Sequence, residues 1–227
     1  MASCGGEGGA SDNPAASPSP ATSPTPEAPD LTIFHNWAYP IAGACLPKSD
    51  NLMPNASRDY RGGTHEGVDF YAVDNCTAIE KNTPALAAKP GRIIRADHDY
   101  TDLTPEQLQR ANDRIAAGDA NAFEVLDLFR GRQVWIDHGK GIVTRYAHLE
   151  GIPEAIVVGV QVETGDVVGF VGDSGTPESI SAPDTEIHLH WEFRVGDSYL
   201  GAGMPPEDVR TLYESLFEPV PDNATFE

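Results

Sequence analysis

The stretch EIHLHWEF, residues 186–193, decides the fold class and the candidate site. Its apolar residues take every second position and its Glu and His residues the positions between, as in a half-buried β-strand. This period places His188 and His190 on one face, roughly 6.6 Å apart along the strand. Two imidazoles at that spacing can share a metal ion, but two polar outward residues explain an isolated His-x-His equally well. Partners elsewhere in the chain must decide.

A second informative stretch, RGGTHEGVDFYA at residues 61–72, contains His65 and Asp69. In an extended chain these two would lie roughly 13 Å apart, too far to share one metal ion with bonds of about 2.1 Å. Three glycines and Val68 disfavour a helix, whereas Gly67 permits the positive φ of a turn. We therefore expect a loop that brings the pair together; taken alone, a surface histidine and a capping aspartate would explain it better.

The region around a third histidine predicts a hairpin. Alternating residues favour strands at 133–139 and 141–149, joined by Gly139-Lys140-Gly141. The second strand ends at His148, and strand ends commonly carry functional residues. Further strands are expected over residues 37–41, 85–88, 91–96, 157–162 and 167–172, the last two joined by a hairpin turn at 164–166.

A helical pattern interrupts the strands. Thr104 is a good N-cap, Pro105 suits the first helical position and Gln107 completes a capping box. A second helix is predicted over residues 119–130. We expect this insertion, about residues 97–130, to form a wall of the cleft. A short helix with one apolar side follows near the C-terminus.

The composition limits the kinds of protein this can be. At 227 residues the chain is long enough for one well-filled domain of roughly 190 residues and a tail. Lys and Arg number 15 against 35 Asp and Glu, and the formal charge of -20 disfavours nucleic acid and anionic membrane surfaces. No apolar run approaches the roughly 18 residues that span a bilayer. We therefore expect neither a nucleic-acid partner nor a transmembrane helix.

The N-terminus, MASCGG at residues 1–6, resembles the end of a bacterial lipoprotein signal, in which small residues precede a lipidated cysteine. No apolar segment precedes it here, so we expect lipidation of Cys4 only in a native form that carries one. Residues 5–29 are rich in Gly, Ala, Ser and Thr, with six prolines from Pro14 to Pro29, and are too polar to fold. We predict a disordered tether over residues 1–30 and a folded domain over 31–227.

Cys45 and Cys76 are the other two cysteines. In an exported protein they are free to pair, because the compartment is oxidising. Closing a loop of about 31 residues would stabilise the fold by roughly 3 to 4 kcal/mol in the chain-entropy model. The alternative is two ordinary buried thiols.

Together these motifs resemble the lysostaphin/LytM-type zinc metallopeptidases, a family of bacterial cell-wall endopeptidases. The matching order is His65-x-x-x-Asp69, then Tyr146-Ala147-His148-Leu149, then His188-x-His190. Any one motif is weak, but three in order on strand-rich sequence are specific, and the resemblance covers about residues 37–195. It implies a mainly β fold, an antiparallel β-sheet groove of the LytM/lysostaphin type (a duplicated hybrid motif), here with an α-helical insertion and a C-terminal helix.

The resemblance also implies residue roles. One Zn²⁺ per chain would be held by His65, Asp69 and His190, with a position left open for water. His148 and His188 would hydrogen-bond that water and the developing oxyanion. Zinc lowers the pKa of water from about 15.7 toward about 7 and polarises the scissile carbonyl, so a neutral imidazole can take the proton and return it to the leaving amine. The spacing alone does not decide whether His188 or His190 is the ligand.

The implied function is a zinc-dependent endopeptidase that hydrolyses peptide bonds in peptidoglycan cross-links or stem peptides. Its partners would be peptidoglycan peptides, and we expect a monomer. It would be exported to the cell envelope, either attached to the membrane only through a lipid anchor or free in the periplasm or outside the cell. The helical insertion and the long acidic segment at residues 177–185 depart from the family pattern. Both would flank the groove and bear on specificity.

Three alternatives come from other classes. A non-catalytic or autoinhibited LytM-like regulator of wall hydrolases is disfavoured because such proteins usually lack ligands, and all five chemical positions are filled here. A two-His-one-carboxylate iron oxygenase would have its first His and its acid separated by one residue. A biotinyl or lipoyl carrier would need a lysine at the turn around Gly165, and none is present. His35, His98 and His138 are expected to be structural.

Overall fold

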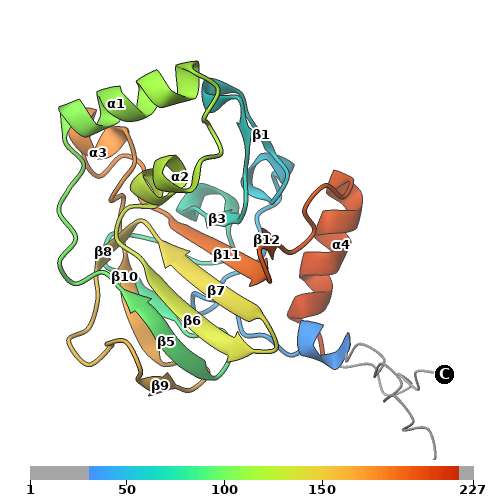
Figure 1. Ribbon diagram of the computed structural model, residues 1–227. Coiled ribbons are helices and arrows are strands. Elements are labelled where there is room, and N and C mark those ends of the chain that lie inside the picture. The colour runs from blue at the N-terminus through green and yellow to red at the C-terminus, as the bar shows by residue number, and fades with distance from the viewer. Residues whose placement is uncertain (1–30, 220–227) are drawn as a thin grey trace, which may run out of the picture. The chain divides into compact units, whose positions relative to one another are not determined.

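The computed structural model describes residues 31–219 and contains mainly antiparallel β-sheet with a few helices (Figure 1). The predicted tether over residues 1–30 and the lipidation site Cys4 lie outside the described residues. The strands are β1 (Ser57–Arg58), β2 (Gly63–Thr64), β3 (Val68–Phe70), β4 (Pro84–Leu86), β5 (Gly91–Ala96), β6 (Val134–Gly139), β7 (Ile142–Ala147), β8 (Leu149–Gly151), β9 (Gln161–Val162), β10 (Val167–Val171), β11 (Leu189–Val195) and β12 (Ser198–Tyr199). The α-helices are α1 (Pro105–Ala116), α2 (Phe123–Arg130), α3 (Glu178–Ser181) and α4 (Pro206–Leu216).

The main sheet has the strand order β12-β11-β7-β6-β5-β9, and β3 pairs with β11 beyond this path. The register of β11 sets His190 opposite Asp69 of β3 on one side and opposite Ala147 of β7 on the other. His148 follows Ala147 at the end of β7. Three stretches that are far apart in the sequence therefore meet at one end of β11. A second sheet, β4-β10-β8, and the pair β1-β2 complete the strand structure.

The core lies on one face of β11, where Leu189, Trp191 and Phe193 are fully buried. The prediction of a half-buried strand is wrong for the other face, because Glu192 has no exposed surface and His190 is 8% exposed. Polar residues from α2 and the loop before β3 cover that face. The sequence period identified the two faces correctly, but it did not indicate that both are covered.

Two predicted β features are absent. Residues 37–41 form no strand: Trp37 N–H donates to Leu216, Ala38 N–H to Ala88, and Leu86 N–H donates to the Pro40 carbonyl, so the segment's hydrogen bonds go to separate partners. The turn at 164–166 is not a hairpin either. It joins β9 of the main sheet to β10 of the second sheet, and its backbone bonds the segment next to β4 instead.

The predicted helices are present. Thr104 and Gln107 form both hydrogen bonds of the capping box of α1. Figure 1 shows α1 and α2 beyond the end of the sheet at which β6 begins, and α4 beside β12. Among the residues that the structure describes, no helix is long and apolar enough to cross a membrane.

A disulfide joins Cys45 and Cys76, as expected. The Asn75 side chain reinforces this crossing, since its Oδ1 accepts from Cys45 N–H at 3.1 Å and its Nδ2 donates to the Cys45 carbonyl at 2.9 Å. The disulfide therefore ties the long N-terminal loop to the segment that follows β3.

Candidate metal centre and its groove

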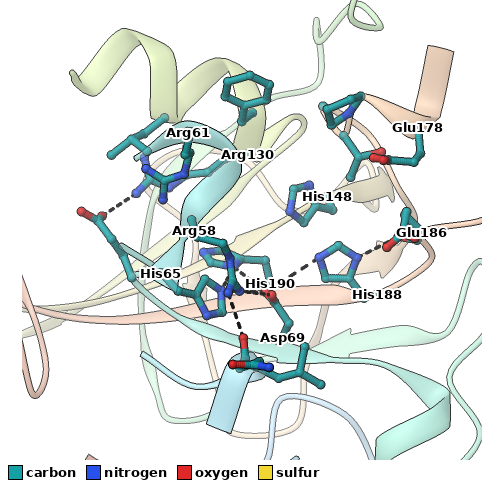
Figure 2. Close-up of a pocket in the computed structure, with 18 of the residues that line it drawn as sticks. Arg58, Arg61, His65, Asp69, Arg130, His148, Glu178, Glu186, His188 and His190 are labelled. Atoms are coloured by element: carbon teal, nitrogen blue, oxygen red, sulfur yellow. Dashed lines mark hydrogen bonds and ion pairs between the residues drawn. The ribbon is translucent and has the colours of Figure 1, made fainter. Parts of the chain in front are cut away.

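Three possible metal ligands meet on the floor of a groove (Figure 2). His65 Nε2 lies 3.0 Å from Asp69 Oδ1 and 3.1 Å from His190 Nδ1, and His190 Nδ1 lies 2.7 Å from the same Asp69 oxygen. All three residues are buried. The structure thus brings the sequence-predicted ligands His65, Asp69 and His190 to one point.

In His65 and His190, the ring nitrogen that faces away from the other ligands lies next to a hydrogen-bond acceptor. His65 Nδ1 lies 3.0 Å from the Met53 carbonyl oxygen, and His190 Nε2 lies 3.1 Å from Glu192 Oε1. A carbonyl or an ionised carboxylate can only accept, so each of these nitrogens carries the proton. The opposite nitrogens, His65 Nε2 and His190 Nδ1, face the centre, where each would offer a lone pair to a metal ion in the neutral form of its ring. Such outer contacts are typical of histidines that bind metal ions.

The loop before Asp69 bends as predicted, but it requires a glycine at position 67 for a reason other than the predicted one. His65 N–H donates to the Ala56 carbonyl at 2.9 Å, and the chain bends at Gly67 before β3 begins. Gly67 does not have a positive φ, contrary to the expectation. A Cβ at this position would lie 2.6 Å from the Trp191 carbonyl oxygen and 2.9 Å from His190 Cε1. Close approach of the loop to β11 requires the glycine.

Two further imidazoles stand beside the three ligands. His188 Nδ1 donates to the Glu186 carbonyl at 2.7 Å, and His148 Nδ1 donates to the Ser174 carbonyl at 2.8 Å. The His148 and His188 ring centroids are 4.5 Å apart, and the His148 and His190 centroids 5.7 Å. Because their Nδ1 atoms are engaged, Nε2 is the nitrogen of each ring that is left to exchange a proton, and that of His188 lies 3.8 Å from Asp69 Oδ1.

Burial sets the protonation of this cluster. It lowers the pKa of His65 and His188 and lowers that of His148 well below its usual value, so these rings are neutral near neutral pH. Burial acts the same way on His190, but hydrogen bonds to Asp69 and Glu192 more than offset it and raise the pKa of His190. A bound cation would reverse that last effect, because two positive charges repel.

The donor set fits a divalent metal ion. Two neutral imidazole nitrogens and one carboxylate oxygen are a usual set for catalytic zinc. Against burial, which would raise it, His65 and His190 hold the pKa of Asp69 well below its usual value, so the carboxylate is ionised. Its second oxygen, Oδ2, accepts from Arg58 Nη2 at 3.0 Å, which leaves Oδ1 directed to the centre. The three atom separations, from 2.7 to 3.1 Å, are shorter than the edge of a tetrahedral site, which is about 3.4 Å for bonds of about 2.1 Å, so the ligands would move slightly apart around an ion.

The groove around this centre has a volume of about 810 Å³. Leu126 and Phe129 of α2 give one wall an apolar stretch, as expected for the helical insertion, while Glu178 and Glu186 lie near His148 and His188 (Figure 2). A groove of this size can hold an extended peptide segment across the three ligand atoms.

Several residues of the site were not singled out from the sequence. Arg58 contacts the ligand Asp69, Arg130 contacts Glu192, and Tyr71 stacks on His188. Tyr71 lies in the informative stretch 61–72, but no local pattern indicates the contacts of these three residues. Glu192 was placed on the histidine face by the strand period, which was the available signal.

The other histidines lie outside the cluster. His98 Nε2 donates to the Ile156 carbonyl at 2.7 Å, and His138 bonds Pro90 and Thr144 while its ring packs on Trp37.

Comparison with known proteins supports these motifs. A family model described as peptidase family M23 matches residues 63–201. A protein called "DD-carboxypeptidase/endopeptidase Mpg" from Neisseria meningitidis is 38% identical over 65 residues, which make up 29% of this chain but 13% of that relative. The chain therefore spans far less than the full length of this relative.

Solved structures are similar over most of this chain. A zinc containing peptidase from Vibrio cholerae has 20% identity over 75% of this chain and 41% of its own, with a TM-score of 0.47. The catalytic domain of the prophage-encoded M23 protein EnpA from Enterococcus faecalis has 19% identity over 75% of this chain and 95% of its own, with a TM-score of 0.45.

Proposed function

Because the chain belongs to peptidase family M23, we propose that it is a zinc-dependent endopeptidase that hydrolyses peptide bonds in peptidoglycan cross-links or stem peptides. One observation carries the proposal: His65 Nε2, His190 Nδ1 and Asp69 Oδ1 converge beside two further imidazoles in a groove. A purely structural histidine cluster has no need of two further neutral rings whose Nε2 atoms can exchange a proton.

His65, Asp69 and His190 would hold one Zn²⁺ per chain. When bound, zinc would lower the pKa of water and polarise the scissile carbonyl. His148 and His188 are neutral and can each accept a proton at Nε2. The ring that accepts the proton at Nε2 can donate it to the leaving amine, so the proton leaves with that amine and both rings are neutral again.

The surroundings proposed for the enzyme follow from the same features. The 45–76 disulfide suits an oxidising compartment, which supports export to the cell envelope. We propose peptidoglycan peptides as the partners and a monomer as the working form. Attachment through a lipidated Cys4 is proposed for a native form that carries a lipoprotein signal. The formal charge of -20 disfavours anionic wall polymers and agrees with a tethered enzyme.

The test is release of muropeptides from purified sacculi, analysed by mass spectrometry. The enzyme is compared as isolated, after chelation, and after chelation and resupply with zinc. We expect new amino termini that disappear with the chelator and return with zinc, and their masses identify the bond that is cut. His98→Ala is a matched control, because this histidine lies outside the cluster. It should release the same products as the wild type.

Failure to release any peptide, with one zinc ion bound per chain, would contradict the endopeptidase. It would instead favour the autoinhibited or regulatory protein, in which Leu126 and Phe129 of the insertion restrict access to the groove.

A further inference from the structure

Arg130, the last residue of α2, extends from the helical insertion into the supports of the metal centre. Its side chain is buried and contacts two carboxylates: Nε donates to Glu192 Oε1 at 2.6 Å, and Nη2 donates to Glu66 Oε2 at 2.7 Å. A guanidinium that bonds two acceptors through different nitrogens holds both in fixed directions. Figure 2 shows Arg130 above the ligands on the groove wall.

Glu192 transmits this contact to a metal ligand. The oxygen that accepts from Arg130, Oε1, also accepts from His190 Nε2 at 3.1 Å. Arg145 and Arg194 both reach the other oxygen, Oε2, at 3.3 Å. Arg130 is therefore the arginine that bonds the very oxygen on which the His190 ring rests.

The backbone of Arg130 reaches a second residue of the site. Its carbonyl accepts from His148 N–H at 2.8 Å. His148 has a φ of 58°, a left-handed conformation that costs free energy in a residue with a side chain and persists where its surroundings hold it. The same residue thus contacts the backbone of one imidazole of the site and the support of another.

We propose that Arg130 is a positioning residue that orients the His190 ring through Glu192 and so couples the helical insertion to metal binding. The inference rests on the proposed function. This positioning role differs from a role in anchoring α2 to the rest of the domain, because a separate contact also anchors the helix. Arg95 Nη2 donates to Asp127 Oδ2 of the same helix at 3.2 Å, with no contact to the site.

The experiment measures zinc affinity directly, by competition with a chromophoric chelator, and so does not depend on activity. Arg130→Met removes the guanidinium; Arg145 and Arg194 still neutralise Glu192, which keeps the fold from being left with an unpaired buried charge. Arg130→Lys keeps the positive charge but cannot direct two N–H groups at fixed angles. Arg95→Ala is the matched control that loosens α2 without touching Glu192.

We expect both Arg130 variants to bind zinc about 10- to 100-fold more weakly, the range typical for loss of a residue that orients a ligand. The kcat should fall while KM changes by less than about threefold, because Arg130 orients the metal ligand His190 and does not bind the substrate. Arg95→Ala should bind zinc within about threefold of the wild type. Thermal unfolding of the apo forms checks that all variants are folded.

Two results would overturn the inference: wild-type zinc affinity in both Arg130 variants, or an equal loss in Arg95→Ala, which would assign the effect to docking of the insertion. A wild-type protein that binds no zinc would instead contradict the proposed function itself, and the inference with it. The two failures are therefore distinguishable.

Discussion

Tyr71 lies flat against His188, with ring centroids 4.2 Å apart and planes inclined by 12°. The Tyr71 hydroxyl donates to Glu186 Oε2 at 2.8 Å, and the Glu186 carbonyl accepts from His188 Nδ1. One aromatic residue therefore supports both the plane of the imidazole and the residue that selects its tautomer. The stacking on His188 and the hydrogen bond to Glu186 can be separated by substitution of Tyr71.

Tyr71→Ala should lower kcat by about 10-fold or more, because the His188 ring loses the surface that holds its orientation. Tyr71→Phe keeps the stacked ring and should stay within about threefold of the wild type. Steady-state kinetics on a purified muropeptide measure both values. Equal losses in the two variants would show that the hydroxyl, and not the stacking, is what His188 requires.

The roles of the histidines can be separated by metal analysis. His190→Ala should lose both zinc and activity, because it removes one of three ligand atoms. His148→Ala and His188→Ala should keep most of the zinc and lose activity by about 100-fold or more, the usual contribution of an acid–base group. Zinc per chain is measured by mass spectrometry after desalting. Retention of zinc in His190→Ala with loss in His188→Ala would reverse the assignment.

Gly67 allows the ligand loop to approach β11, so Gly67→Ala should destabilise the protein by about 1 to 3 kcal/mol, since the neighbouring Trp191 carbonyl belongs to the sheet and cannot move aside. The same Cβ would press on the His190 ring, and zinc affinity should fall as well. Gly151→Ala is the control, because its Cβ would meet Phe170 at an ordinary 3.7 Å. Urea denaturation and chelator competition give the two quantities. Unchanged zinc affinity would show that the loop moves without the ligand.

The sequence was sufficient to predict the residues that converge but not those that support them. The period of residues 186–193 placed His188, His190 and Glu192 on one face, since alternation is a local property of the chain. Arg130 contacts Glu192 across 62 positions, and no local pattern indicates that pairing. The sequence also suggested a half-buried strand, because Arg130 and Arg145, which cover the polar face of β11 together with its own Arg194, come from other segments.

The predicted hairpin at residues 164–166 was wrong for a similar reason, because strand pairing also depends on distant segments. The turn at 164–166 has ordinary hairpin chemistry, but β9 and β10 pair with strands of two different sheets. Turn residues determine the local path of the chain, whereas tertiary packing selects the partner of each strand. Gly67 is a related case, because its need for glycine comes from β11 and not from its own φ.

Loss of the disulfide should cost stability without affecting the chemistry of the site. Cys45→Ser/Cys76→Ser should lower the free energy of unfolding by about 3 to 4 kcal/mol, because closing a 31-residue separation restricts the unfolded chain. Urea denaturation measures the loss, and reduced wild type should match the variant. Zinc affinity should stay unchanged, since neither cysteine lines the groove. Rapid labelling of both thiols in the oxidised protein would contradict the disulfide.

The pH dependence of kcat should report the depressed pKa of His148. Burial and the neighbouring His188 and His190 lower this pKa well below the ordinary 6.5. A base with a lowered pKa is neutral above pH 6.5 and loses that form only as the pH falls through its value in the folded protein. The acid limb of the kcat profile should therefore lie below pH 6.5, and bound zinc should move it lower still.

Folding stability changes in the same direction, so it must be measured alongside the rate. Unfolded histidines bind protons more readily than the buried rings of His65, His148 and His188, and stability should fall as the pH drops below 6.5. Thermal unfolding across the same pH range separates loss of fold from loss of the neutral base. An acid limb above pH 6.5 in fully folded protein would mean that neither His148 nor His188 is the group that accepts the proton, because burial lowers the pKa of both.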